Sequence, residues 1–108
     1  MPNNMVTTTF SFEGYRIKEY KGVVRGIIVR APTISQGILG GLKSFVGGKI
    51  GAYTNMCEDT REQAYQLMLK HAEVGANAVV GLRYDASDVV QNSTEVLCYG
   101  TAVVIERE

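Results

Sequence analysis

Gly75-Ala76-Asn77-Ala78-Val79-Val80-Gly81 is the stretch that decides the fold, because it joins a helix to a strand with almost no loop between them. Glycine tolerates the left-handed conformation in which many helices end, so Gly75 marks the end of the preceding helix. The residues from Ala78 onward are apolar and partly β-branched, which is typical of a buried strand. The stretch therefore predicts a domain in which a helix and a sheet are consecutive.

A long helix is expected before this joint. Its predicted range runs from Gly51 or Tyr53 to Val74, although Asp59-Thr60 could also mark its start. Mostly small and apolar residues, with Arg61 among them, recur at helical spacing on one face, and polar residues mark the opposite, solvated face. The first set is Cys57, Arg61, Ala64, Met68, Ala72 and Gly75, and the second is Glu58, Glu62, Gln66, Lys70 and Glu73.

Three segments have the composition of apolar strands. Gly22–Arg30 is nearly continuous in β-branched residues, and Pro32 closes it because proline cannot donate a hydrogen bond to a ladder. Ala78–Tyr84 follows the helix, and Glu95–Ile105 comes near the end of the chain. The mostly polar residues 85–94 predict a hairpin loop between the last two strands.

Two weaker elements complete the predicted pattern. Val6–Phe12 alternates apolar and hydroxyl residues, which favours a strand, and Tyr15–Tyr20 is expected to pair back against it. Apolar residues at spacings of three and four predict a short helix over Thr33–Val46, although its glycines weaken it. The predicted fold class is α+β, a small two-layer structure with an antiparallel sheet, one long helix and one short helix.

The strands are apolar on both faces, which predicts self-association. An antiparallel sheet covered on one side should alternate apolar and polar residues, yet the strands around Val23, Val79 and Val103 do not. One long and one short helix can cover a single face, and the connecting loops are too short to cover the other. A partner subunit is the simplest cover, so we expect a homo-oligomer.

Composition limits the class of protein. The 108 residues fit one domain, taken as 1–108, and the 11 basic residues equal the 11 acidic residues in number. A net charge of zero does not steer the chain toward nucleic acid or an anionic membrane, and it leaves association unopposed. The beginning of the sequence has no targeting pattern, and no stretch is long and apolar enough to span a bilayer. We expect a cytoplasmic protein with reduced cysteines.

The residues that could carry chemistry are few. Cys57 and Cys98 lack metal-type spacing, and His71 is the only histidine, so neither a metal site nor a nucleophilic triad is defined within one chain. Cys98 has the surroundings of an inert core thiol, whereas Cys57, expected near the start of a helix, is the candidate metal ligand if a symmetric ring supplies several copies. Asp85 and Asp88 could form a carboxylate pair, although solvated turn residues are the usual explanation.

Motifs distributed over nearly the whole chain, in order, resemble one known family. They are Glu13-Gly14, Ile17, Tyr20, Gly22-Val23-Val24, Gly26, Val46-Gly47-Gly48, Gly51-Ala52-Tyr53, Arg61, Ala64, Gly75 to Gly81 and Gly100-Thr101-Ala102-Val103. Together they are similar to the YbjQ family of small bacterial and archaeal proteins. The resemblance implies a dodecin-like α+β subunit that assembles into a ring-shaped homopentamer, and a label of heavy-metal binding that the family sometimes carries.

Three functional hypotheses follow, in order of preference. The first is a cytoplasmic homo-oligomer, a pentamer by resemblance, that binds a small ligand or ion and does not catalyse a reaction. The second is a soft-metal or selenium carrier that uses Cys57 in a ring. The third is an enzyme that uses His71 or the pair Asp85 and Asp88. No cofactor and no catalytic residue is specified by the sequence.

Overall fold

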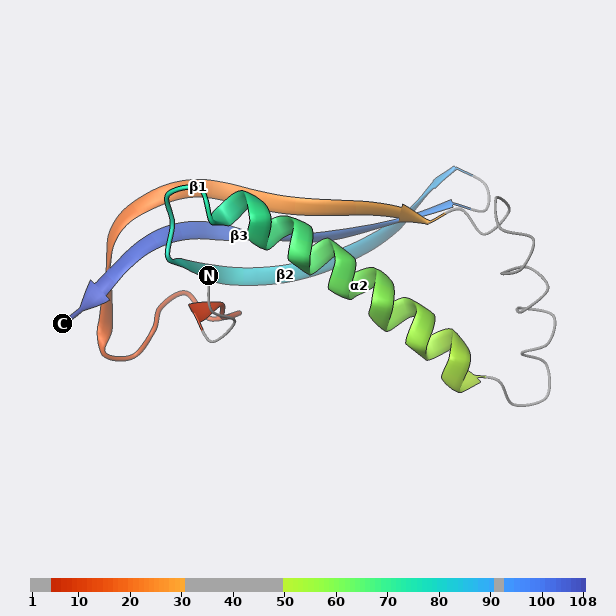
Figure 1. Ribbon diagram of the computed structural model, residues 1–108, viewed down its shortest axis with the longest axis horizontal. Helices are drawn as coiled ribbons and strands as arrows, with labels where there is room; N and C mark the ends of the chain where they lie inside the picture. The colour runs from red at the N-terminus through yellow and green to blue at the C-terminus, as the bar shows by residue number, and fades with distance from the viewer. Residues whose placement is uncertain (1–4, 31–49, 91–92) are drawn as a thin grey trace.

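The computed structural model describes residues 5–30, 50–90 and 93–108. Within them lie the strand β1 (Tyr15–Arg30), the helix α2 (Ile50–Ala72) and the strands β2 (Ala78–Val90) and β3 (Ser93–Arg107), as Figure 1 shows. The long helix and the apolar strands predicted from the sequence are confirmed. The short helix predicted over residues 33–46 lies outside the described residues.

The three strands form one antiparallel sheet in the order β1-β3-β2. Along β1, the pairing with β3 runs from Tyr15 opposite Arg107 to Arg30 opposite Thr94. The pairing of β2 with β3 begins with Ala78 opposite Val103. The α+β class and the antiparallel sheet are therefore confirmed, and β3, the last strand in the sequence, is the central one.

The prediction of a hairpin loop over residues 85–94 is wrong. β2 continues to Val90 and β3 begins at Ser93, so that Asp85 lies opposite Leu97 and Asp88 opposite Thr94. Polar residues can occupy this part of β2 because its side chains from residue 83 to residue 89 are exposed on both faces. Where neither face is buried, no apolar alternation is required, and the pattern that identifies a strand is missing.

The N-terminal segment Val6–Phe12 is not a strand of the sheet. It lies along β2, where Val6 forms a single parallel bridge with Val79 and the Gly81 N–H donates to the Thr9 carbonyl at 2.8 Å. The Thr9 hydroxyl donates to the Ser11 carbonyl at 2.8 Å, a local bond of the kind that competes with a ladder. The predicted partner of this segment, Tyr15–Tyr20, pairs with β3 instead.

The helix α2 lies across one face of the sheet, mainly over β1 and β3 (Figure 1). Its closest approach to β1 is at Gly26, where an added Cβ atom would lie 2.2 Å from the Ala64 carbonyl oxygen and 2.6 Å from the Met68 nitrogen. Only glycine fits beneath the helix at this position. The core between the layers comprises Ala64, Met68, Leu69 and Ala72 of α2, with Val79, Leu82, Val96, Cys98 and Ala102 of the sheet.

The opposite face of the sheet, which we call the far face, is covered over part of its length. Ala78, Val80, Val103 and Ile105 are buried there. Their cover comes from the N-terminal segment and the start of β1, through Met5, Phe12, Tyr15 and Ile17. This second apolar cluster lies near the first residues of β1 and the last residues of β3, so the rest of the far face lies beyond it.

The joint between α2 and β2 has the predicted glycine ending. Gly75 has a φ of 95°, the left-handed conformation that residues other than glycine adopt at a cost. Asn77 then extends the pairing with β3 through its side chain. Its amide nitrogen donates to the Ile105 carbonyl at 3.0 Å, and the Ile105 N–H donates to its amide oxygen at 2.8 Å. The side chain of Asn77 thus substitutes for a strand backbone one residue before β2 begins.

Replacing Asn77 should destabilise the fold through these two bonds. We expect Asn77→Ala to lower the free energy of unfolding by about 1 to 3 kcal/mol, because two backbone groups of Ile105 lose their partner. Urea denaturation followed by circular dichroism measures the change. Asn55→Ala, the same substitution at an exposed position of α2, is the matched control and should stay within about 0.5 kcal/mol of the wild type. Equal effects of the two substitutions would contradict this role.

Candidate functional site

The candidate metal ligand Cys57 is exposed on α2. It is the eighth residue of a helix that begins at Ile50. The helix dipole favours a negative charge only within the first turn, and Cys57 lies beyond that turn. The sequence interpretation placed Cys57 closer to the helix start and is corrected on this point. The thiol remains accessible to a soft metal ion from solvent.

Cys98 is a core residue, as its sequence surroundings indicate. Its side chain is fully buried beneath α2, and burial raises the pKa of the thiol. A hydrogen bond from the Tyr84 hydroxyl opposes that shift without reversing it. Because a thiolate is the form that binds metals and attacks electrophiles, Cys98 is a poor candidate for either task.

Two tyrosines accompany Cys98 and form with it a cluster that we call the tyrosine–thiol cluster: Tyr65, Tyr84 and Cys98. Burial, the neighbouring Cys98 sulfur and the hydrogen bond to it together raise the pKa of Tyr84 to about 12. Burial also raises the pKa of Tyr65, with smaller contributions from Cys98 and Glu62. The Arg61 guanidinium lies 5.6 Å from the centre of the Tyr84 ring. The cluster thus joins helix and sheet through neutral phenols.

The raised pKa of Tyr84 predicts a loss of stability in alkali. The unfolded chain ionises this phenol near the ordinary value of 10.0, whereas the folded chain does so near 12. The folded state is therefore disfavoured progressively as the pH rises from 10 to about 12, and its full stability is present below 10. Chemical denaturation across this pH range measures the effect.

The loss between pH 10 and 12 should be smaller in Tyr84→Phe, which has no phenol to ionise at this position. Tyr20→Phe is the matched control, because the Tyr20 side chain is exposed and should leave the wild-type dependence unchanged. A Tyr84→Phe chain that loses stability as steeply as the wild type would show that Tyr84 is not the group responsible.

His71 is exposed in the last turn of α2, and its Nδ1 lies 2.9 Å from the Arg25 carbonyl oxygen. A carbonyl only accepts, so Nδ1 carries the proton in this bond. The fourteen positions from Cys57 to His71 span about 21 Å at 1.5 Å per residue of helix. One chain therefore does not bring its exposed thiol and its imidazole together, and the Cys-His arrangement needed for nucleophilic catalysis is not formed.

Asp85 and Asp88 do not form a carboxylate pair. Both lie on β2 in a stretch of regular pairing, and because residues three positions apart on a strand point to opposite faces, the two side chains diverge. The Asp85 Oδ1 accepts from the Ala86 N–H at 2.9 Å, and the Asp88 Oδ1 accepts from the Thr94 hydroxyl at 3.3 Å. Each carboxylate thus accepts a hydrogen bond from a neighbouring residue of the hairpin formed by β2 and β3.

Within residues 5–30, 50–90 and 93–108, no three side chains of His, Cys, Asp or Glu are gathered in a way that could hold a metal ion. Cys57 therefore lacks companion ligands in the described part of a single chain.

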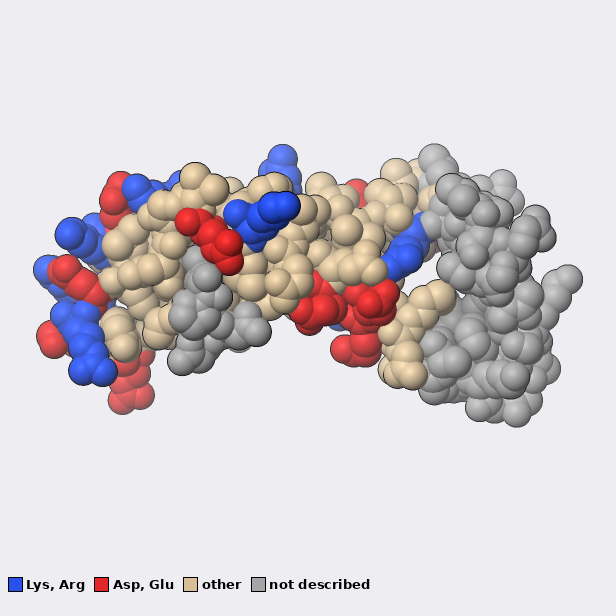
Figure 2. Space-filling model, viewed as in Figure 1, with Lys and Arg blue, Asp and Glu red and all other residues tan. Residues whose placement is uncertain are grey.

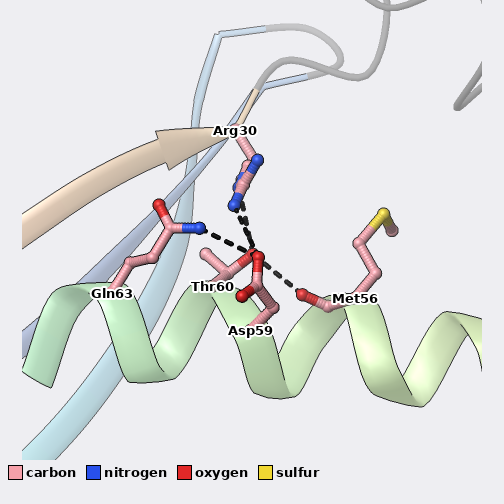
Figure 3. A network of polar contacts seen from close by, with 5 residues as sticks. All are labelled: Arg30, Met56, Asp59, Thr60 and Gln63. Carbon is pink, nitrogen blue, oxygen red and sulfur yellow. Dashed lines mark hydrogen bonds and ion pairs between the residues drawn. The ribbon is translucent and has the colours of Figure 1, made fainter.

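A network of polar contacts fixes the middle of α2 to the end of β1 (Figure 3). The Arg30 Nε donates to the Thr60 hydroxyl at 3.0 Å, and its terminal nitrogen lies 3.3 Å from the Asp59 carboxylate. Thr60, which is only 4% exposed, donates in turn to the Met56 carbonyl at 3.0 Å. Gln63 donates to the same Asp59 oxygen at 2.9 Å.

A shallow groove runs between α2 and β1. Its volume is about 390 Å³. Two apolar side chains, Ile28 of β1 and Leu67 of α2, line it together with Glu62, Gln63, Gln66 and Lys70 of the helix. Figure 2 shows carboxylates gathered over the middle of α2. The acidic residues Glu58, Asp59 and Glu62 of this part of the helix are exposed. Sequence periodicity indicated the polar face of α2 but gave no sign of this groove, which depends on where the helix crosses β1.

A model of a protein family described as "Putative heavy-metal-binding", the YbjQ family, matches residues 4–106. The chain belongs to the YbjQ family. A UPF0145 protein of Legionella pneumophila strain Corby is 63% identical over 102 residues, which cover 94% of this chain and 97% of the relative. A UPF0145 protein of Francisella tularensis subsp. tularensis is 57% identical over 105 residues, which cover 94% and 99%. The resemblance found in the sequence motifs is thereby confirmed.

A solved structure shares the fold. It is the crystal structure of a protein of unknown function of the DUF74 family from Pediococcus pentosaceus, with a TM-score of 0.60 and 24% identity, covering 94% of this chain and 96% of the other. At that identity the likeness concerns the fold alone. Among the described residues, no helix is both long enough and apolar enough to cross a membrane.

Proposed function

We propose that this YbjQ-family chain is the subunit of a cytoplasmic homo-oligomer that binds a small ligand or ion and does not catalyse a reaction. The observation that carries this proposal is the exposure of three apolar side chains of β1 on the far face: Val23 is 70% exposed, Ile27 41% and Val29 57%. Apolar patches of this kind on a small chain commonly mark an interaction site. A second copy supplies a cover without requiring any other partner.

The dimensions of the elements support this view. The 16 residues of β1 extend over about 50 Å at 3.3 Å per residue, whereas the 23 residues of α2 reach about 35 Å. The helix and the N-terminal segment therefore cover only part of such a long sheet. A ring of five copies is the arrangement that the family resemblance implies, and we adopt it as the oligomer of this proposal.

The separation of the reactive groups favours binding over catalysis. His71 lies about 21 Å along the helix from Cys57, and the two aspartates of β2 point apart. Both cysteines are free, which is the state expected in a reducing compartment and supports a cytoplasmic location.

Light scattering coupled to size-exclusion chromatography tests the assembly. We expect a mass five times the 11.8 kDa of one chain, and no monomer at low micromolar concentration. The exposed side chains of Val23, Ile27 and Val29 supply the physical reason, because leaving them in water is unfavourable. A stable, folded monomer at these concentrations would overturn the homo-oligomer.

The second candidate function is a soft-metal or selenium carrier that uses Cys57. The exposure of this thiol and the description of the family model favour it. Thiolates bind soft metals, and a ring brings one Cys57 from each copy to equivalent positions.

Metal analysis tests the carrier function on protein purified without an affinity tag and then loaded with cadmium. We expect bound cadmium to fall at least tenfold in Cys57→Ala, because the substitution removes the only exposed thiol of the described residues. Asn55→Ala, on the same exposed stretch of α2, should bind as the wild type does. Stoichiometric metal that is unaffected by the loss of Cys57 would exclude this residue as the ligand.

A further inference from the structure

We propose that the groove between α2 and β1 binds a short apolar peptide with free termini, whose ammonium group lies at Glu62 and whose carboxylate lies at Lys70. The groove has opposite charges at its two ends, and apolar side chains and amide oxygens between them. A free peptide carries the matching groups in the same order. The inference rests on the proposed function, in which the chain binds a small ligand, and it names the class of that ligand.

One face of α2 supplies most of the lining of the groove. Glu62, Gln66 and Lys70 follow one another at steps of four residues, which makes them neighbours on the helix surface. Glu62 and Lys70 are therefore separated by about 12 Å along the helix axis, at 1.5 Å per residue. They are the only charged side chains of the lining. The groove thus has a negative end near the middle of α2 and a positive end at its last turn.

Neither of these two charges is neutralised within the described part of the chain. The ion pairs there join Arg16 to Glu106, Lys21 to Glu19 and Arg30 to Asp59. The Lys70 ammonium therefore has no carboxylate within ion-pair distance. The Glu62 Oε2 accepts one hydrogen bond, from the Gln66 amide at 2.7 Å. Because a carboxylate has about four acceptor positions, Glu62 can still bind the ammonium group of a ligand.

Two glutamines supply hydrogen-bond acceptors between the charged ends. The Gln63 Nε2 donates to the Asp59 carboxylate at 2.9 Å, as Figure 3 shows, and the Gln66 Nε2 donates to Glu62. Because a carboxylate only accepts, these bonds fix the orientation of both amides. The Oε1 atoms of Gln63 and Gln66 are left without a donor among the described residues. Backbone N–H groups in the middle of a bound peptide are suitable donors for them.

The apolar part of the groove and its length indicate the composition of the peptide. Ile28 and Leu67 are both half-buried and present apolar surface, which favours apolar side chains in the ligand. The volume of about 390 Å³ lies within the range of about 300 to 1,000 Å³ found for small-molecule sites. An extended peptide of two or three residues reaches about 7 to 11 Å, which suits the spacing of Glu62 and Lys70.

Other occupants leave part of the groove unsatisfied. An apolar anion such as a fatty acid would have no positive group for Glu62, and a polyamine would have no negative group for Lys70. An internal segment of a larger protein lacks both terminal charges. The combination of charges, acceptors and apolar surface therefore points to a peptide with both termini free.

Isothermal titration calorimetry on the full chain tests the inference, with the tripeptide Val-Ala-Leu as the probe. We expect binding at millimolar peptide concentration. The N-acetylated and the C-amidated forms of the same peptide should each bind about two- to fivefold more weakly, because exposed ion pairs each contribute modestly. Equal affinity for all three forms, or no binding of the free tripeptide at millimolar concentration, would overturn the inference.

Two substitutions assign each terminus to its partner. Glu62→Gln should remove the preference for a free amino group and keep the preference for a free carboxylate, and Lys70→Gln should do the reverse. Glu58→Gln and Lys18→Gln are the matched controls, because they remove the same charges at exposed positions outside the groove and should keep both preferences. Circular dichroism establishes that each variant is folded. Folded Glu62→Gln and Lys70→Gln chains that keep both preferences would overturn this placement of the peptide.

The outcomes also separate this inference from the proposed homo-oligomer, because a single chain forms the whole groove. An oligomeric wild type that does not bind the tripeptide would overturn the peptide site and leave the homo-oligomer standing. A monomeric wild type that binds the tripeptide with both preferences would do the opposite.

Discussion

The close approach of α2 to β1 at Gly26 is the constraint on which the rest of this structure depends. A backbone oxygen and a backbone nitrogen of the helix lie where any side chain would begin, so the two layers meet there without side chains between them. This contact sets the height of the helix above the sheet. It thereby determines which residues are enclosed around Met68 and Cys98 and which are left outside, including those of the groove beside Leu67.

The sequence predicted those parts of the fold that depend on local chemistry. The glycine at position 75 has the left-handed conformation that its place at a helix end requires, and the apolar strands lie where their composition indicates. The strand structure within residues 85–94 was not predicted, because a strand exposed on both faces lacks the alternation of apolar and polar residues by which strands are recognised. For residues 6–12 the error was the reverse, because a strand was predicted and none forms. Their alternation is that of a strand, but their hydroxyl groups bond to nearby backbone.

The candidate site was less accessible to sequence reasoning than the fold. Residue type was enough to identify Cys98 as a core thiol, but not to place it against the Tyr84 hydroxyl, which is brought to it by strand pairing. The separation of His71 from Cys57 follows from helix geometry once both are known to lie on α2. The role of Asn77 could not be predicted from the sequence. Its side-chain amide substitutes for strand backbone, and this is recognised only from its two hydrogen bonds to Ile105 in the structure.

Two irregularities in β1 allow the strand to change length without disturbing the contact at Gly26. One lies between Ile17 and Glu19 and the other between Tyr20 and Gly22, and in each a lysine has no partner on β3. An extra residue of this kind is accommodated by a local bulge, and the pairs on either side of the bulge are kept. Deletion of Lys18 would therefore leave Glu19 opposite Val104 and Gly26 opposite Cys98, beneath the helix. The strand can lose a residue at either bulge while the position of α2 above the sheet is retained.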